Sequence, residues 1–141
     1  MSVRFGDESW PEDTQVLHSV SQEIGDDDLP ALQGIPGLLE LALLDTDRHR
    51  RIVHPITDLS PLAELTELRV LELPRSTVAD LAPLRALNHL RRLDVAFTRV
   101  ADVTPLLELP GLEWVKLTGA PAADDGPGVQ ALRDRGVEVI S

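Results

Sequence analysis

Residues 56–62, ITDLSPL, recur 22 positions later as VADLAPL (residues 78–84) and again as VADVTPL (residues 100–106). An Asp and a Pro keep the same places in all three copies, so the match is more than a shared apolar composition. A period of about 20–29 residues is typical of solenoids, in which each repeat is a small unit stacked on the next. The repeat therefore decides the fold before any other feature of the chain.

The spacing of apolar residues changes within each unit. From Leu59 to Leu71 a leucine stands at every third position, and from Leu71 to Leu73 at every second. The first spacing is typical of a helix or 3₁₀ turn and the second of a strand. A proline at the start of the helical part, such as Pro61, loses no hydrogen bond there. We therefore expect an α/β solenoid: a curved parallel sheet with short helices or 3₁₀ turns on the convex side.

Five units can be aligned, and together they make one domain with about five strands. The first unit is eight residues longer than the others, and its insertion lies within residues 45–55, just after its strand. The last unit is degenerate, and it keeps the 22-residue offset if Val137 and Val139 take the places of Val115 and Leu117. The predicted units are residues 26–55, 56–77, 78–99, 100–121 and 122–141.

Both ends of such a stack need cover. Residues 1–25 are expected to form an N-terminal cap. Ser9 and Glu12 make the S-x-x-E pattern of a capping box, and the apolar residues of 16–24 share one helical face, so this cap is predicted to be helical. At the other end the last strand is an exposed edge, which invites pairing with another chain.

The chain is acidic, with 24 Asp and Glu against 13 Lys and Arg and a formal net charge of −11. Such a charge repels phosphate backbones and favours a basic protein partner, so we expect no binding to nucleic acid. The sequence has no Cys, which excludes disulfides and thiolate chemistry, and no apolar run of about 18 residues that could span a membrane. We therefore expect a soluble cytoplasmic protein without membrane contact.

The units resemble the bacterial leucine-rich repeats of the 22-residue internalin-like class, whose pattern is L-x-x-L-x-L-x-x-[NT]-x-[IV]-x-D-[LI]-x-P-L. Residues 68–84 and 90–106 follow it closely, with Ser76 and Thr98 at the Asn/Thr place. The resemblance covers about residues 26–141 and implies a solenoid that serves as a protein-binding scaffold. Because Ser76, Thr98 and Ala120 replace the usual Asn, it also implies a weaker side-chain ladder beneath the loops.

The residues that alternate with the inward leucines are expected to face outward on the concave side of the sheet. Trp114 is expected there beside Arg92, and Trp and Arg are enriched among interface hot spots. Alternatively, Trp114 folds over its neighbours, and Phe97 either extends this surface or plugs a loop. The charged residues of the same face either pair along the sheet or read a basic segment. The predicted partner-binding residues are Trp114, Arg92, Val70, Glu72, Asp94, Lys116 and Phe97.

The insertion is the one concentrated basic feature, with Arg48, Arg50 and Arg51 beside His49 and His54. It is either a solvated loop or a recognition loop. Its acidic and histidine residues fit no ligand spacing, so no metal is predicted. The acidic run at residues 26–28 lacks the glycine and glutamate of a calcium loop and is interpreted as helix-start charge.

The sequence carries no catalytic motif and no phosphate loop, so we predict neither an enzyme nor a cofactor. The hypothesis is a non-catalytic module that binds another protein or peptide on its concave face, in its most concrete version an inhibitor or immunity-type protein of a basic partner. Two alternatives stay open. One is an enzyme or enzyme subunit with a site at residues 45–55, and the other is self-association through the C-terminal edge strand. The chain is expected to be a monomer or a weak homodimer.

Overall fold

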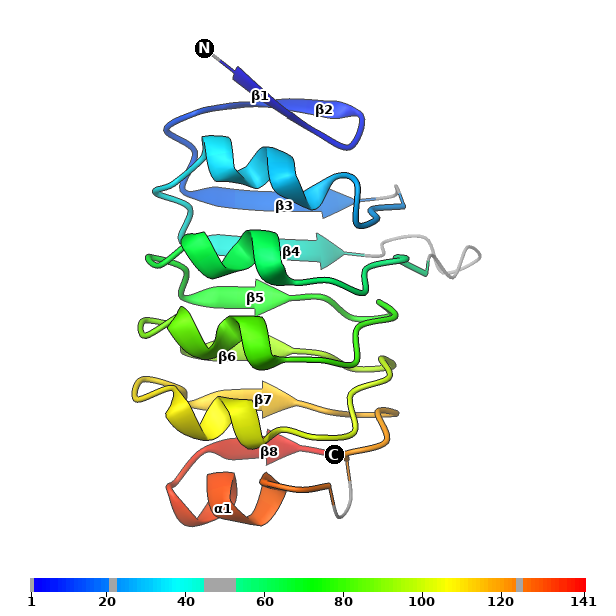
Figure 1. Ribbon diagram of the computed structural model, residues 1–141, viewed down its shortest axis with the longest axis vertical. Coiled ribbons are helices and arrows are strands. Elements are labelled where there is room, and N and C mark those ends of the chain that lie inside the picture. Colours follow the sequence, from blue (N-terminus) through cyan, green and yellow to red (C-terminus); the bar gives the residue numbers. More distant parts are fainter. Residues whose placement is uncertain (1, 21–22, 45–52, 124–125) are drawn as a thin grey trace.

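Six parallel strands follow one another in sequence order across a single sheet (Figure 1). The computed structural model describes residues 2–20, 23–44, 53–123 and 126–141. Each strand pairs with the strand of the next unit, so every repeat lies against its sequence neighbours. The predicted α/β leucine-rich-repeat solenoid is confirmed. The strands are β3 (Val16–Val20), β4 (Glu40–Leu44), β5 (Val70–Glu72), β6 (Arg92–Asp94), β7 (Trp114–Lys116) and β8 (Glu138–Ile140).

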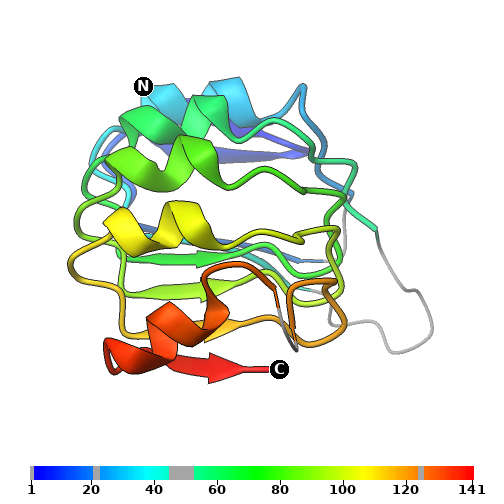
Figure 2. The same cartoon turned by 60° about the horizontal axis from the view of Figure 1, so that its bottom comes forward.

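Short helical turns cover one face of this sheet, and Figure 2 shows no described element on the other face. Each of the four 3₁₀ turns has a proline as its second residue, as expected where the first turn needs no amide hydrogen. The Asp before the turn explains the other fixed position of the repeat, because in three units its carboxylate accepts a hydrogen bond of 2.9 Å from the amide two residues later. The turns are η1 (Leu29–Gly34), η2 (Ser60–Glu64), η3 (Ala82–Ala86) and η4 (Thr104–Glu108), followed by the α-helix α1 (Val129–Asp134).

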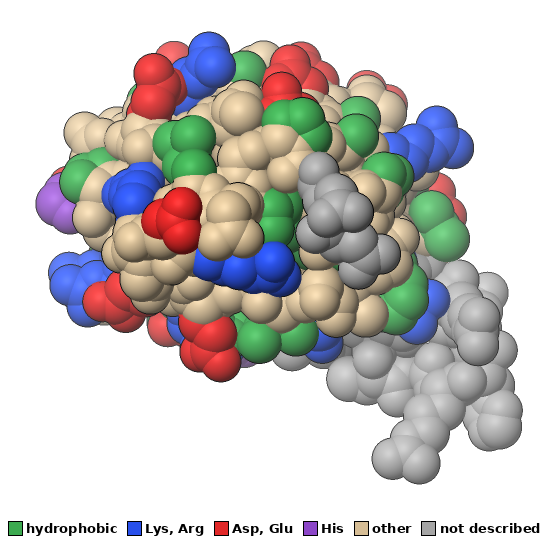
Figure 3. Space-filling view, turned by 90° about the horizontal axis from the view of Figure 1, so that it is seen from below, with side chains coloured by type: hydrophobic (Ala, Val, Ile, Leu, Met, Phe, Trp, Pro, Cys, Tyr) green, Lys and Arg blue, Asp and Glu red, His purple; other side chains and the backbone are tan. Residues whose placement is uncertain are grey.

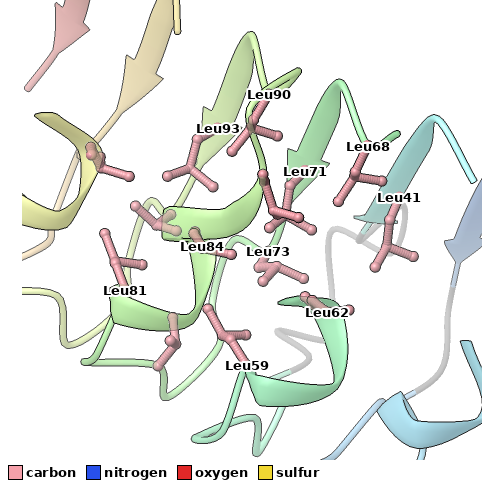
Figure 4. Close-up of a cluster of buried hydrophobic side chains, with 14 of the residues drawn as sticks. Leu41, Leu59, Leu62, Leu68, Leu71, Leu73, Leu81, Leu84, Leu90 and Leu93 are labelled. Atoms are coloured by element: carbon pink, nitrogen blue, oxygen red, sulfur yellow. The ribbon is translucent and has the colours of Figure 1, made fainter. Parts of the chain in front are cut away.

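Leucines fill the space between the turns and the sheet (Figure 4). Leu71 and Leu93 point inward from neighbouring strands and pair in register, while Leu62 and Leu84 point inward from the turns. All four side chains are fully buried. Burial of apolar surface contributes roughly 25 cal/mol per Å², so this continuous core is the main source of stability. It leaves the other face of each strand free to carry polar residues.

The predicted helical cap at residues 1–25 is wrong. Strands β1 (Ser2–Phe5) and β2 (Glu8–Pro11) form an antiparallel hairpin instead, and this hairpin contacts η1. Phe5 is fully buried, and Trp10 packs against the core. Ser9 and Pro11 lie within a strand, so the S-x-x-E pattern caps no helix here. The hairpin covers the first turn of the solenoid.

The sheet has a sixth strand, β3, where the sequence predicted helix. Leu17 is buried opposite Leu41, and Ile24 is buried seven residues after Leu17. The same interval separates Leu71 from Val78, so residues 17–24 are part of one more repeat. The helical spacing of the apolar residues was coincidental, because inward residues of a strand and of the following loop also recur at intervals of seven.

The last unit does not keep the expected register. Val139 of β8, not Val137, pairs with Val115 of β7. The unit contains the α-helix α1 in place of a 3₁₀ turn, and an α-helix needs more residues for the same rise. Two additional residues therefore separate the strands, and Glu138 lies beside Trp114 instead of Lys116.

The Asp26 carboxylate joins the unit of residues 26–55 to the unit of residues 56–77. Its oxygens accept hydrogen bonds from the amides of Thr57 (2.8 Å) and Asp58 (2.9 Å) and from the Thr57 hydroxyl (2.6 Å). Burial raises the pKa of Asp26, but these hydrogen bonds from the Asp58 amide and from Thr57 outweigh it and hold the pKa below its ordinary value of 3.8. Asp26 therefore acts as an anionic clamp between units rather than as helix-start charge.

Replacing Asp26 by Ala is expected to lower the melting temperature by about 2–5 °C at pH 7, because three hydrogen bonds between units are lost. A lowered pKa means that the folded state favours the ionised carboxyl, so its contribution is complete above pH 3.8 and is lost as the pH falls through the folded value. The difference in melting temperature between D26A and the wild type should shrink below pH 3.8. A difference that stays constant or grows in acid would contradict the clamp. The control is D27A, because the exposed Asp27 carboxylate makes no hydrogen bond with the described residues.

Candidate functional site

The uncovered face of the sheet, called the open face below, carries two rows of outward side chains at the strand positions before and after the inward leucines. Their alignment follows from the pairing of the strands. The first row is Val16, Glu40, Val70, Arg92, Trp114 and Glu138, and the second row is His18, Ala42, Glu72, Asp94, Lys116 and Ile140.

The Arg92 guanidinium stacks over the Trp114 ring, with 4.2 Å between its central carbon and the ring centroid. Arg92 is exposed and Trp114 is partly exposed, so the pair lies at the surface of the sheet. Val70 stands beside Arg92 in the same row and is also partly exposed. A cation over an aromatic ring at an exposed site contributes about 0.5–1 kcal/mol, which favours the stacked position of the ring on the open face.

Two carboxylates lie side by side in the second row. Glu72 and Asp94 are direct neighbours on β5 and β6, and Lys116 follows Asp94 on β7. Asp94 accepts a hydrogen bond of 2.9 Å from the Ala96 amide, but none of the three charged groups forms a salt bridge with a described residue. Of the two alternatives for these charges, pairing along the sheet would need a salt bridge from Lys116, and Lys116 forms none with a described residue. At the N-terminal end of this face, His18 and Glu40 lie 3.7 Å apart.

A second arginine–aromatic pair lies in the loops that follow β5 and β6. The Arg75 guanidinium is 4.8 Å from the centroid of the Phe97 ring, and Phe97 is 51% exposed. Both residues have left-handed backbone, with φ of 59° and 57°, at the position that Gly119 occupies in the next unit with φ of 73°. A Cβ on Gly119 would approach the Phe97 ring to 2.5 Å, so the ring lies against this glycine. Phe97 does not plug the loop.

Left-handed backbone is unfavourable for a residue with a side chain, by roughly 1–2 kcal/mol. We therefore expect F97G to be more stable than F97A by about 1 kcal/mol, although both variants lose the ring. Urea unfolding monitored by circular dichroism measures the difference. The exposed residue Arg99, whose φ is not positive, supplies the control, because R99A should be more stable there than R99G. The same order of stability at both positions would contradict the proposed strain.

The insertion residues Arg48, Arg50 and Arg51 lie outside the described residues, as does His49. His54 is described, and its assignment to a basic loop is wrong. Its side chain is 2% exposed, and Nδ1 accepts a hydrogen bond of 3.0 Å from the Ile24 amide. An accepting Nδ1 carries no proton, so His54 is part of the core rather than of a basic surface.

The side chains at the Asn/Thr place of the repeat bond within their own unit, whereas main-chain hydrogen bonds such as that from the Phe97 amide to the Thr118 carbonyl (2.7 Å) join the loops of neighbouring units. The Ser76 hydroxyl donates to the Leu73 carbonyl at 2.8 Å, and the Thr98 hydroxyl donates to the Val95 carbonyl at 2.6 Å. Both residues are buried. Their hydroxyls are too short to replace an Asn side chain that would bridge two units.

The C-terminal end of the sheet is β8, which pairs with β7 and with no other described strand. Glu138 is exposed, and Val139 and Ile140 are partly exposed. Figure 3 looks onto this end and shows hydrophobic side chains interspersed with acidic and basic ones. The described residues contain no group of three or more His, Asp or Glu side chains that could hold a metal ion. Among them, no helix has the length and apolar character needed to cross a membrane.

No protein-family model matches the chain, and no curated protein matches it in sequence. Solved structures of bacterial leucine-rich-repeat proteins are similar in fold. Internalin C2 of Listeria monocytogenes aligns with 84% of the chain at 26% identity and a TM-score of 0.57, and a leucine-rich-repeat protein of Leptospira interrogans aligns with 79% at 19% identity and 0.62. The chain spans 58% of the first protein and 27% of the second.

The fold is thus that of a bacterial-type leucine-rich-repeat protein. Proteins of this fold generally take part in protein interactions and are generally not enzymes. Arg75 was missed at the sequence level. The only signal was its alignment with Phe97 and Gly119, which marks a shared loop position but does not reveal the stacking.

Proposed function

We propose that the chain is a non-catalytic module that binds another protein or peptide on the open face, with Arg92 and Trp114 at the centre of the contact. The stacked Arg92–Trp114 pair carries this proposal, because it holds a large aromatic surface and a charged planar group on a face that no described element covers. Residues of these two types dominate binding energy at protein interfaces. Val70 adds apolar surface beside them, and Phe97 extends the contact toward the loops.

The net charge of −11 favours a basic partner, which makes an inhibitor or immunity-type role the most concrete form of the proposal. The proposal includes a cytoplasmic location and no cofactor. The sequence has no cysteine, so the fold needs no oxidising compartment for disulfides and offers no thiolate ligand. The inserted arginines Arg48, Arg50 and Arg51 are proposed as a side wall of the contact.

Position-specific photo-crosslinking tests the proposal in cells that naturally contain the protein. Benzoylphenylalanine at Val70 on the open face should give a discrete adduct, whereas the same group at Glu64, exposed on η2, should not. Replacing Arg92 and Trp114 by Ala should reduce the Val70 adduct at least about thirtyfold, the equivalent of ~2 kcal/mol. The control R133A changes an exposed arginine on α1 and should leave the adduct unchanged. Equal adducts from positions 70 and 64, or an adduct that survives the double change, would exclude the open face.

Self-association is a second candidate because one edge of β8 pairs with none of the described residues and Val139 is only partly buried. In that case light scattering should show a dimer that dissociates on dilution, and V139P should abolish it. A monomer at millimolar concentration would exclude this candidate.

A further inference from the structure

The two arginine–aromatic pairs lie at opposite ends of β6. Arg92, which stacks on Trp114, is the first residue of this strand, and Phe97, which stacks on Arg75, follows its last residue by three positions. An extended chain rises about 3.3 Å per residue, so the backbone between Arg92 and Phe97 spans at most about 17 Å. Two aromatic rings, the partly exposed Trp114 and the exposed Phe97, are therefore separated along the strand direction.

Between these groups lies the pair of carboxylates Glu72 and Asp94. Like charges directly opposite each other on neighbouring strands are unfavourable, and neither group forms a salt bridge with a described residue. Lys116 stands on the other side of Asp94, also without a salt bridge. A cation supplied from outside the chain would offset the repulsion between the two carboxylates. Along the strand direction the order is thus the Arg92–Trp114 pair, the two carboxylates with Lys116 beside them, and the Arg75–Phe97 pair.

We infer that the open face recognises an extended segment of a partner protein, lying along β6, with a basic residue between two apolar residues. In an extended segment, residues i, i+2 and i+4 point to the same side and span about 13 Å. The first apolar side chain would contact Val70 and the stacked Arg92–Trp114 pair, the basic one would lie between Glu72 and Asp94, and the last would contact Phe97. This inference rests on the proposed function and specifies the chemistry of the partner segment and the strand along which it lies.

Selection from a displayed peptide library tests the inference with the full chain. The library displays peptides with five randomised positions between Gly-Ser flanks. Binders are selected separately on the wild type, on E72Q/D94N, on the control E64Q/E67Q and on R92A/W114A. The wild type should enrich apolar residues at positions 1 and 5, and Lys or Arg at position 3 about tenfold over the unselected library. The amide of D94N keeps an acceptor for the Ala96 amide, so the loop geometry is retained. In E72Q/D94N the central preference should vanish while the outer positions stay enriched.

Three results would overturn the inference: no central basic preference with the wild type, persistence of that preference in E72Q/D94N, or its loss in E64Q/E67Q, which removes two exposed carboxylates elsewhere. A synthetic winning peptide should lose at least about tenfold in affinity, ~1.4 kcal/mol, when its central base is replaced by Glu. If R92A/W114A abolishes selection but the selected pattern lacks the base, the proposed function stands and only the inference fails. If R92A/W114A selects as the wild type does, both fail.

Discussion

Replacing Leu93 by Ala is expected to lower the free energy of unfolding by about 2–5 kcal/mol. Leu93 is fully buried at the centre of the sheet, between Leu71 and Val115 in register. Removing its side chain loses the transfer free energy of the buried atoms and leaves a cavity that the close-packed repeats cannot collapse around. A domain of this kind is stable by only about 5–15 kcal/mol, so the variant should be close to unfolding at 37 °C.

Urea unfolding of L93A beside V16A measures this effect. Val16 is 45% exposed on the outward side of β3, so its truncation should change stability by no more than about 0.5 kcal/mol. A comparable loss at both positions would mean that the two faces of the sheet are not the covered and open faces described above.

Replacing His54 by Ala should cost about 2–4 kcal/mol, a large effect for a residue that the sequence places in a basic loop. The Ile24 amide would lose its acceptor while buried, and an unpaired buried donor costs about 1–3 kcal/mol in addition to the cavity. The His54 amide also donates a hydrogen bond to the Arg75 carbonyl, and its carbonyl accepts one from the Thr77 amide. The residue therefore joins the chain that follows the insertion to the unit of residues 56–77.

The variant H54N separates the hydrogen bond from the volume, because an Asn oxygen can occupy the place of Nδ1 and should restore part of the lost stability. H89A provides the control, since His89 is exposed and should tolerate the change within about 0.5 kcal/mol. If H54A and H89A unfold at the same urea concentration, the Ile24–His54 hydrogen bond does not contribute to the free energy of unfolding.

The repeat was predictable because its signals are local and repeated. Three copies with Asp, Pro and leucine at fixed places define the turn, the strand and the inward face, and each copy supports the others. The same reasoning predicted that Arg92 and Trp114 lie side by side, since a shared 22-residue offset places both in one row. That these residues bind a partner remains a proposal.

The errors lie where a unit departs from the regular length. Leu17 and Ile24 carry the seven-residue interval of the repeat, but Ser19 stands where other strands have a second apolar residue, and the helical spacing was the simpler interpretation. At the other end, α1 changes the number of residues per unit, which a fixed offset cannot accommodate. The left-handed backbone of Phe97 and the burial of His54 depend on contacts between units, which no single segment encodes.

The contacts between neighbours also have an evolutionary consequence. Because the described helices and strands of each unit lie against only those of the units before and after it, the outward residues of one strand can change without disturbing the packing of distant units. Residues 78–99 contribute Arg92, Asp94 and Phe97 as a single block of coding sequence. Exchange of that block by recombination would alter three of the proposed contact residues at once and leave the remaining scaffold in place, which is a short route to a new binding preference.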